Sequence, residues 1–129
     1  MPSLSTKNKK EINMMITKKF SFDSAHKLMN YKGKCRFLHG HTYLLNVTLK
    51  GNVDKKSGMV FDFSTIKMIV EKKVLSILDH SYINDIIKQP TAENMAVWIW
   101  EHLEKDLPIY KIELWETPDS YVTYYGKNN

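Results

Sequence analysis

Two stretches of the chain alternate between apolar and polar residues, as strands with one buried face do. They are Ile16–Phe22 and His41–Gly51, and the second keeps four alternate positions apolar. The residues GNVDKKSG that overlap its end predict a turn. Near the C-terminus, residues 110–117 and 120–125 predict two further strands, joined by the turn TPDS.

Two other stretches show the three- to four-residue spacing of an amphipathic helix. The first covers residues 64–77, with Ser64 as its expected N-cap. The second lies within QPTAENMAVWIWEHLEKDLP, where Thr91 is the expected N-cap, Glu93 suits the positive first turn and Pro108 stops the helix. The order strand-strand-helix-helix-strand-strand predicts an α+β domain, with the helices on one face of an antiparallel sheet.

Length and composition indicate how many domains the chain forms and where the domain begins. The chain has 129 residues, 43% hydrophobic and 26% charged, which is typical of a globular protein with one core. We expect residues 1–13 to form a flexible tail and residues 14–129 to form the single domain. The polar N-terminus predicts no export signal, and no apolar run approaches the length of a membrane span. The single cysteine excludes an internal disulfide and favours a reducing, cytoplasmic location.

The net charge of +5 raises two possible partners, nucleic acid or a phosphorylated small molecule. The lysines occur as scattered pairs and in the N-terminal segment, and no basic run is interleaved with aromatic residues. A protein that binds single-stranded nucleic acid needs such a combination. We therefore expect neither a nucleic-acid nor a membrane partner.

Candidate chemistry gathers in CRFLHGHTY, residues 35–43. His39 and His41 are two positions apart on an expected strand, so both imidazoles point to the same side and can bind one metal ion. His26 lies at the end of the preceding strand, and it joins them if the two strands pair. Three protein ligands with one open position describe a catalytic zinc site. The alternative is a pair of core histidines with one histidine at the surface.

Cys35 leaves two alternatives open, since its spacing does not distinguish them. As a fourth ligand it would close a structural zinc site, and as a nucleophile or base it would stand beside an open one. The adjacent Asp79 and His80 supply a carboxylate and an imidazole, which together with a thiol make a proton-transfer relay. Glu116 shares a face with Ile112 and Leu114, where a carboxylate needs a partner. The alternative for Glu116 is exposure beyond the sheet edge.

The sequence resembles the family of 6-pyruvoyltetrahydropterin and 6-carboxytetrahydropterin synthases from about Met15 to Gly126. The motifs FDSAHKL, CRFLHGHTY, GMVFDFSTIK, LDHSYIN, PTAENMAVWIW and ETPDSYVTYY occur in the family order. The resemblance implies the tunnelling fold (T-fold), built as strand-strand-helix-helix-strand-strand. It also implies a homo-oligomer, commonly a hexamer of two trimers, with active sites between subunits.

The resemblance also implies a role for each matching residue. His26, His39 and His41 match the Zn2+ ligands, Cys35 matches the catalytic thiol, and Asp79 and His80 match its partner pair, contributed by a neighbouring subunit. The pterin would be held by Glu116, with Thr117 beside it and with Thr91 and Glu93 in the pocket wall. The family usually has arginine after the first zinc histidine, whereas this chain has Lys27, which keeps the charge but loses the bidentate fork. That leaves a phosphate-binding role for Lys27 open.

The implied substrate is 7,8-dihydroneopterin triphosphate, and both branches of the family eliminate triphosphate from it. The carboxy branch also releases acetaldehyde and leaves 6-carboxytetrahydropterin for queuosine biosynthesis. The short spacing C-x-x-x-H-G-H resembles this branch, while the pyruvoyl branch usually has a longer interval. Two other hypotheses stay open: a zinc-stabilised module that binds RNA without catalysis, and a different pterin enzyme, such as an epimerase or aldolase, on the same fold.

Overall fold

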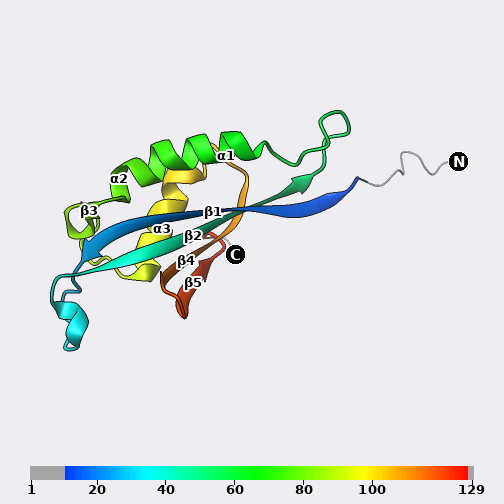
Figure 1. The fold of residues 1–129 in the computed structure, drawn as a ribbon. Helices are drawn as coiled ribbons and strands as arrows, with labels where there is room; N and C mark the ends of the chain where they lie inside the picture. Colours follow the sequence, from blue (N-terminus) through cyan, green and yellow to red (C-terminus); the bar gives the residue numbers. More distant parts are fainter. Residues whose placement is uncertain (1–10, 128–129) are drawn as a thin grey trace, which may run out of the picture.

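The computed structural model describes residues 11–127 of the chain, and Figure 1 shows how their elements are arranged. The strands are β1 (Asn13–His26), β2 (His39–Asn52), β3 (Ser81–Tyr82), β4 (Ile109–Thr117) and β5 (Ser120–Tyr124). The helical elements are η1 (Lys34–Arg36), α1 (Phe63–Val70), the π-turn η2 (Glu71–Leu75), α2 (Ser76–Leu78), η3 (Ile83–Asp85) and α3 (Ala92–Leu103). The expected order of long strands and helices is therefore confirmed.

The two longest strands, β1 and β2, pair antiparallel over their whole length, from Asn13 opposite Asn52 to His26 opposite His39. β1 extends beyond the stretch that alternation predicted by three residues at its start and four at its end, whereas β2 gains only two and one. The register matters for function because it brings the last residue of β1 beside the first residue of β2. The segment between them, residues 27–38, projects from this end of the sheet with the short turn η1 (Figure 1).

The sheet has the order β3-β1-β2-β4-β5 and is mixed, which corrects the expected antiparallel sheet. The long strands pair antiparallel, but β3 pairs parallel with β1 at Ser24–Ser81 and Ala25–Tyr82. A strand of two residues carries no detectable alternation, so the sequence did not predict it. This strand fixes the chain immediately after Asp79 and His80 against the edge of β1.

Both long helical stretches lie on the same side of the sheet (Figure 1). The first begins one residue earlier than expected, because Asp62, and not Ser64, is its N-cap: the Asp62 carboxylate accepts a hydrogen bond from the Ser64 N–H at 3.1 Å. The expected cap of α3 is confirmed, since the Thr91 hydroxyl accepts from the Asn94 N–H at 3.1 Å. α3 ends at Leu103, before Pro108.

One hydrophobic core joins the helices to the sheet. Its largest fully buried members include Tyr43 and Leu45 from β2, Ile66 from α1, Ile99 from α3 and Leu114 from β4. Burial of side chains of this size contributes about 1.5–3 kcal/mol each, so the core fixes the strand ends on which the site is built.

Most of the expected tail, residues 1–10, lies outside the described residues, as do residues 128–129. Asn13, assigned to the tail, instead begins β1, and the Ile12 carbonyl accepts a hydrogen bond from Val53 at 2.8 Å. Within the described part of the chain, no helix has the length and apolar character needed to cross a membrane.

Candidate active site

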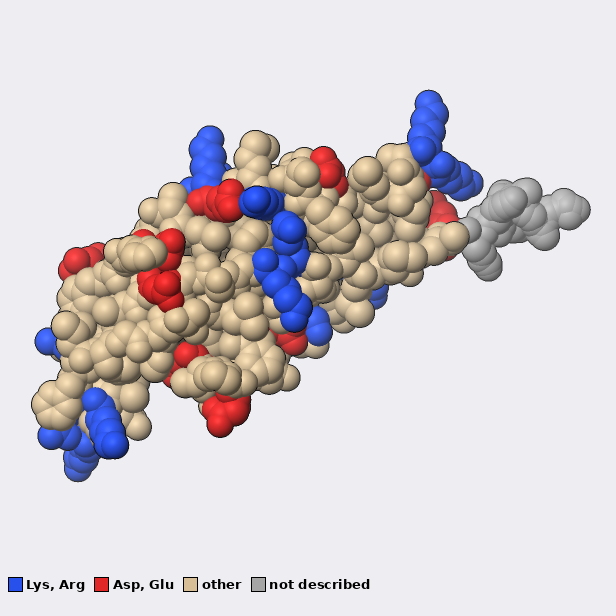
Figure 2. Space-filling model, in the orientation of Figure 1, with Lys and Arg blue, Asp and Glu red and all other residues tan. Residues whose placement is uncertain are grey.

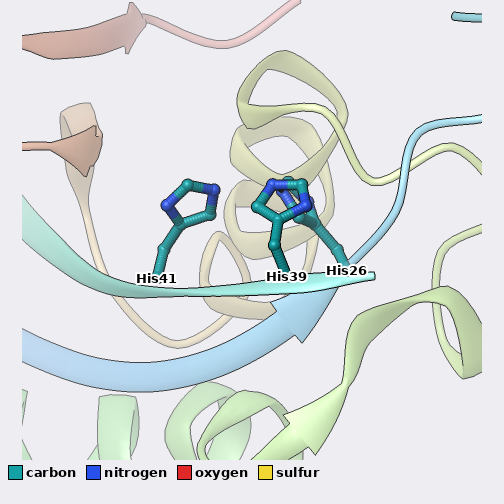
Figure 3. A group of neighbouring side chains, drawn as sticks. All are labelled: His26, His39 and His41. Carbon is teal, nitrogen blue, oxygen red and sulfur yellow. Dashed lines mark hydrogen bonds between the residues drawn. The ribbon is translucent and has the colours of Figure 1, made fainter. Parts of the chain in front are cut away.

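Three histidines meet where β1 ends and β2 begins. The register places His26 directly opposite His39, and His41 follows two residues later on the same face of β2. One ring nitrogen of each residue lies within 4.8 Å of the corresponding nitrogens of the other two. Figure 3 shows the three rings projecting to the same side of the two strands. The structure thus confirms that strand pairing brings His26 to the H-x-H pair.

Main-chain carbonyls define which nitrogen of two of these rings faces the centre. His26 Nδ1 lies 2.7 Å from the Pro90 carbonyl, and His39 Nδ1 lies 2.8 Å from the Phe37 carbonyl. A carbonyl only accepts, so each Nδ1 carries the proton and each Nε2 presents a lone pair. These two Nε2 atoms are 3.1 Å apart, a distance at which two lone pairs repel. A cation between them removes that repulsion, and carbonyl-oriented rings of this kind are typical of metal ligands.

The third ring points the same way. His41 Nε2 is buried and has no hydrogen-bond partner among the described residues. Burial lowers the pKa of His41 and of the fully buried His26, and the nearby Glu116 carboxylate only partly opposes this. Neutral imidazoles with free Nε2 atoms are the form in which histidine binds Zn2+. The donor set fits a three-histidine zinc site.

Glu116 borders this centre on one side and a pocket on the other. Its Oε2 lies 3.4 Å from His26 Nε2 and 3.8 Å from His41 Nε2, and its side chain is 27% exposed. Glu116 is also the extra residue of a β-bulge, because Trp115 pairs with Tyr121 and Thr117 with Ser120. Bulges of this kind aim single side chains beside active sites. The inward orientation inferred from its parity is therefore confirmed.

A hollow of about 230 Å3 opens beside Glu116. Two other residues expected in the pterin pocket, Thr91 and Glu93 at the start of α3, line it as well. Sequence reasoning missed Leu28 and Tyr121, which add an apolar and an aromatic wall. A carboxylate at one end of a pocket with apolar walls suits a flat heterocycle with adjacent N–H donors.

Cys35 lies apart from the histidine cluster. It is half-buried in the turn η1, and its Sγ is not among the ligand atoms that gather within 4.8 Å of one another. Its main-chain carbonyl accepts a hydrogen bond from the Leu28 N–H at 2.7 Å. The structure thus favours a metal site open at its fourth position over a site closed by Cys35.

Asp79 and His80 form their own group at the edge of β1. His80 Nδ1 lies 3.0 Å from Asp79 Oδ1, and the same oxygen accepts from the Asp23 N–H at 3.0 Å. The hydrogen bond to the Asp23 main chain is the largest contribution that lowers the pKa of Asp79. His80 has a positive φ of 57°, in the left-handed region, and its side chain is 77% exposed.

This pair does not share a ligand cluster with the three histidines of the same chain, since the Asp79–His80 group contains Asp23 instead. The carboxylate fixes the imidazole, which presents its other nitrogen outward. Nothing in the sequence indicated that Asp23 holds this pair, because the contact uses main-chain atoms.

Two residues expected to bind the substrate, Thr117 and Lys27, do not line the pocket beside Glu116. The Thr117 hydroxyl donates to Asp119 Oδ1 at 2.9 Å within the β4–β5 turn, so this side chain stabilises the turn and does not line the pocket beside Glu116. Lys27 follows His26, and its main-chain N–H and carbonyl both bind the Asn84 side chain, at 3.0 and 2.9 Å. No ion pair within residues 11–127 involves the Lys27 ammonium group at 4.0 Å or less.

Comparison with known proteins decides the family. The profile of the family described as "6-pyruvoyl tetrahydropterin synthase" matches residues 15–127. The chain belongs to this family. The match spans all five strands except the first two residues of β1 and includes each of the clustered histidines.

Members of the family with both product names are similar to the chain. The 6-carboxy-5,6,7,8-tetrahydropterin synthase of Haemophilus influenzae is 40% identical over 84% of this chain and 96% of its own. The Synechocystis protein of the same name is 38% identical over 87% of this chain and 93% of its own. Among solved structures, the Caenorhabditis elegans 6-pyruvoyl tetrahydropterin synthase superposes with a TM-score of 0.84 at 30% identity, covering 91% of this chain and 98% of that one. The T-fold expected from the sequence is confirmed.

Proposed function

We propose that the protein is a zinc-dependent 6-carboxy-5,6,7,8-tetrahydropterin synthase. It would convert 7,8-dihydroneopterin triphosphate to 6-carboxytetrahydropterin, acetaldehyde and triphosphate, as a step of queuosine biosynthesis. The observation that carries this proposal is the cluster of three Nε2 atoms with Glu116 Oε2 3.4 Å from one of them. In this proposal the metal centre and the pterin anchor are adjacent in one site.

The roles of the residues follow from their chemistry. The Glu116 carboxylate accepts hydrogen bonds from the ring N–H and exocyclic amine of the pterin, and Thr91 and Glu93 lie along the same pocket. His26, His39 and His41 would hold Zn2+, which supplies a Lewis acid that polarises oxygen atoms of the substrate side chain. Cys35, as thiolate, takes a proton from side-chain carbon.

Asp79 and His80 complete the proton transfer in this proposal. The Asp79 carboxylate orients the His80 imidazole, and the imidazole exchanges protons with Cys35 of a neighbouring subunit. Two observations support this arrangement. The His80 side chain is 77% exposed, and within one chain His80 groups with Asp23 and Asp79 and not with the three clustered histidines. We accordingly propose a homo-oligomer, with a hexamer of two trimers as the expected form. Mixing inactive Cys35→Ala protein with inactive His80→Ala protein tests it, because mixed assemblies regain activity only if sites are shared.

Two observations favour the carboxy product. The relatives at 40% and 38% identity carry that name, and the thiol precedes the first paired histidine by four residues. The pyruvoyl product is the second candidate, supported by the name of the structural relative with a TM-score of 0.84. On the face in Figure 2, lysines and arginines lie among acidic residues except in a small group at the lower-left end, and no continuous basic stripe of the kind an RNA-binding module needs crosses this face.

Product analysis tests the proposal directly. Zinc-loaded protein is incubated with 7,8-dihydroneopterin triphosphate, and pterins and aldehydes are identified by mass spectrometry, with Cys35→Ala as the inactive control. Acetaldehyde together with a 6-carboxy pterin is the expected result. A 6-pyruvoyl product without acetaldehyde would establish the second candidate instead, and pterin binding without turnover would indicate a different pterin enzyme. The cytoplasmic location expected from the sequence stays a prediction.

A further inference from the structure

The segment that leaves β1, residues 27–29, is held from both sides by main-chain hydrogen bonds. On one side, the Leu28 N–H donates to the Cys35 carbonyl at 2.7 Å. This bond ties the thiol-bearing turn to the chain that follows His26. The main-chain groups of Lys27 and Met29, on either side of Leu28, bind other partners.

On the other side, two side-chain amides take the place of a neighbouring strand. Asn84 Oδ1 accepts from the Lys27 N–H at 3.0 Å, and Asn84 Nδ2 donates to the Lys27 carbonyl at 2.9 Å. Gln89 repeats the pattern at Met29, where both bonds are 2.7 Å long. An amide offers one acceptor and one donor group side by side, which is the complement of a residue's own N–H and carbonyl. The four bonds continue the β1 ladder beyond its last strand neighbour.

The same stretch of chain also holds a proposed metal ligand. Pro90, which follows Gln89, accepts the hydrogen bond of His26 Nδ1 at 2.7 Å. The Gln89 carbonyl in turn accepts from Asn94 Nδ2 at 2.9 Å, which connects it to the first turn of α3. Residues 84–90 therefore set the orientation of a histidine of the centre and the path of the segment behind the thiol.

Besides the Leu28 bond, the turn that carries Cys35 is fixed by hydrogen bonds within residues 32–37 and by the contact of the Phe37 carbonyl with His39 Nδ1. None of its three residues, Lys34–Arg36, is buried, and no side chain caps it. Phe37 and Leu38, which follow it, are 59% and 64% exposed. An element without buried side chains takes its position from its hydrogen bonds. The bond from Leu28 is thus a main determinant of where the thiol lies.

We propose that Asn84 and Gln89 are positioning residues for the Cys35 thiol. They hold Lys27 and Met29, these fix the Leu28 N–H, and this N–H fixes the turn. The inference rests on the proposed function, in which Cys35 transfers a proton. Proton transfer requires the Cys35 sulfur and the substrate carbon to lie close together, and a displacement of about 1 Å can lower the rate about 100-fold.

The kinetic test removes the amides and keeps their size. Asn84→Leu and Gln89→Met are made singly and together, with Asn52→Leu as the matched control. Asn52 also makes two side-chain hydrogen bonds, to Asn13 and Glu11, but at the far end of the β1–β2 pair. We expect the double variant to lose at least about tenfold in kcat, with a smaller change in KM because Leu28 in the pocket wall moves while Glu116 remains in place, and with unchanged zinc content. A general loss of structure would instead lower zinc binding and raise KM.

A second measurement needs no substrate. Cys35 is the only cysteine, so its alkylation by iodoacetamide reports the exposure and environment of this one thiol. We expect the rate to change at least about threefold in the double variant, because the released turn samples more positions, and to stay unchanged in Asn52→Leu. If wild-type protein does not turn over the triphosphate but alkylation changes as described, the proposed function fails and the positioning role stands.

Three outcomes would overturn the positioning role. The first is a double variant with the kcat and alkylation rate of the wild type. The second is an equal loss in Asn52→Leu. The third is loss of the folded state, seen by circular dichroism, in both single variants as well as the double variant, since the amides would then determine the fold and not the position of the thiol.

Discussion

The effect of replacing Glu116 on pterin affinity is the most quantitative test of the site. Glu116→Gln keeps the size of the side chain and one acceptor oxygen, but it turns the second acceptor into an N–H2 group that faces a donor of the pterin. The carboxylate is only 27% exposed, so its contacts are partly shielded from water. Loss of a charge-assisted hydrogen bond of this kind costs about 2–3 kcal/mol. The dissociation constant for the pterin should therefore rise about 30- to 150-fold.

Calorimetric titration with neopterin measures this change, and Glu113→Gln is the matched control. Glu113 lies on the same strand but contacts Lys111 and Asn46, at 3.8 and 3.3 Å, away from the histidines. Its replacement should change the affinity for neopterin less than twofold. Equal affinities of the Glu116 variant and the wild type would refute the anchor role, and so would an equal loss in the control.

Metal analysis of the same variant separates the anchor from the metal ligands. We expect zinc to remain bound, because the three imidazoles are intact. Glu116 Oε2 lies 3.4 Å from His26 Nε2 and 3.8 Å from His41 Nε2, so the measurement also tests it as a metal ligand. Loss of zinc in Glu116→Gln would therefore assign its carboxylate to the metal.

Three further predictions concern other parts of the molecule. His39→Ala should lose most bound zinc and nearly all turnover, as measured by elemental analysis and product formation, because two imidazoles hold a catalytic ion poorly. Cys35→Ala should retain zinc and neopterin binding while kcat falls about 10²–10⁴-fold, and loss of zinc would show that the thiol is a ligand. Gly126→Ala should lower the free energy of unfolding at least about 1 kcal/mol more than Gly58→Ala in urea titrations. Both glycines have positive φ, but only at Gly126 would the new Cβ meet the Trp100 ring, at 2.6 Å; equal losses would contradict this.

The sequence predicted those parts of the site that depend on periodicity. The two-residue spacing of His39 and His41 fixes a shared face on any strand, and pairing of the flanking strands then requires His26 to join them. The inward orientation of Glu116 followed from the same argument. Local patterns suffice for the two histidines because the direction of a side chain on a regular strand depends on its parity, whereas the bulge at Glu116 left no such signal.

Other features depend on main-chain atoms of distant segments, which leave no periodic signal. Asn84 binds the main chain of Lys27, 57 residues away, and nothing in either sequence stretch marks the partner. The parallel strand β3, with only two residues, is equally invisible to alternation. The Ser64 cap failed for a simpler reason, since Asp62 is an equally good N-cap two residues earlier and the chain becomes helical there first.

The pairing of His26 with His39 has one more consequence. The register of β1 and β2 brings the two residues together whatever lies between them, so the twelve residues of 27–38 form a loop whose ends are already closed. Lengthening such a loop adds little entropic cost, about 0.6 kcal/mol for each doubling. The three histidines lie on the paired strands β1 and β2, whereas Cys35 lies in the loop between them, whose length can vary without changing the strand register. Insertions in residues 27–38 are therefore expected to move the thiol without disturbing the three histidines.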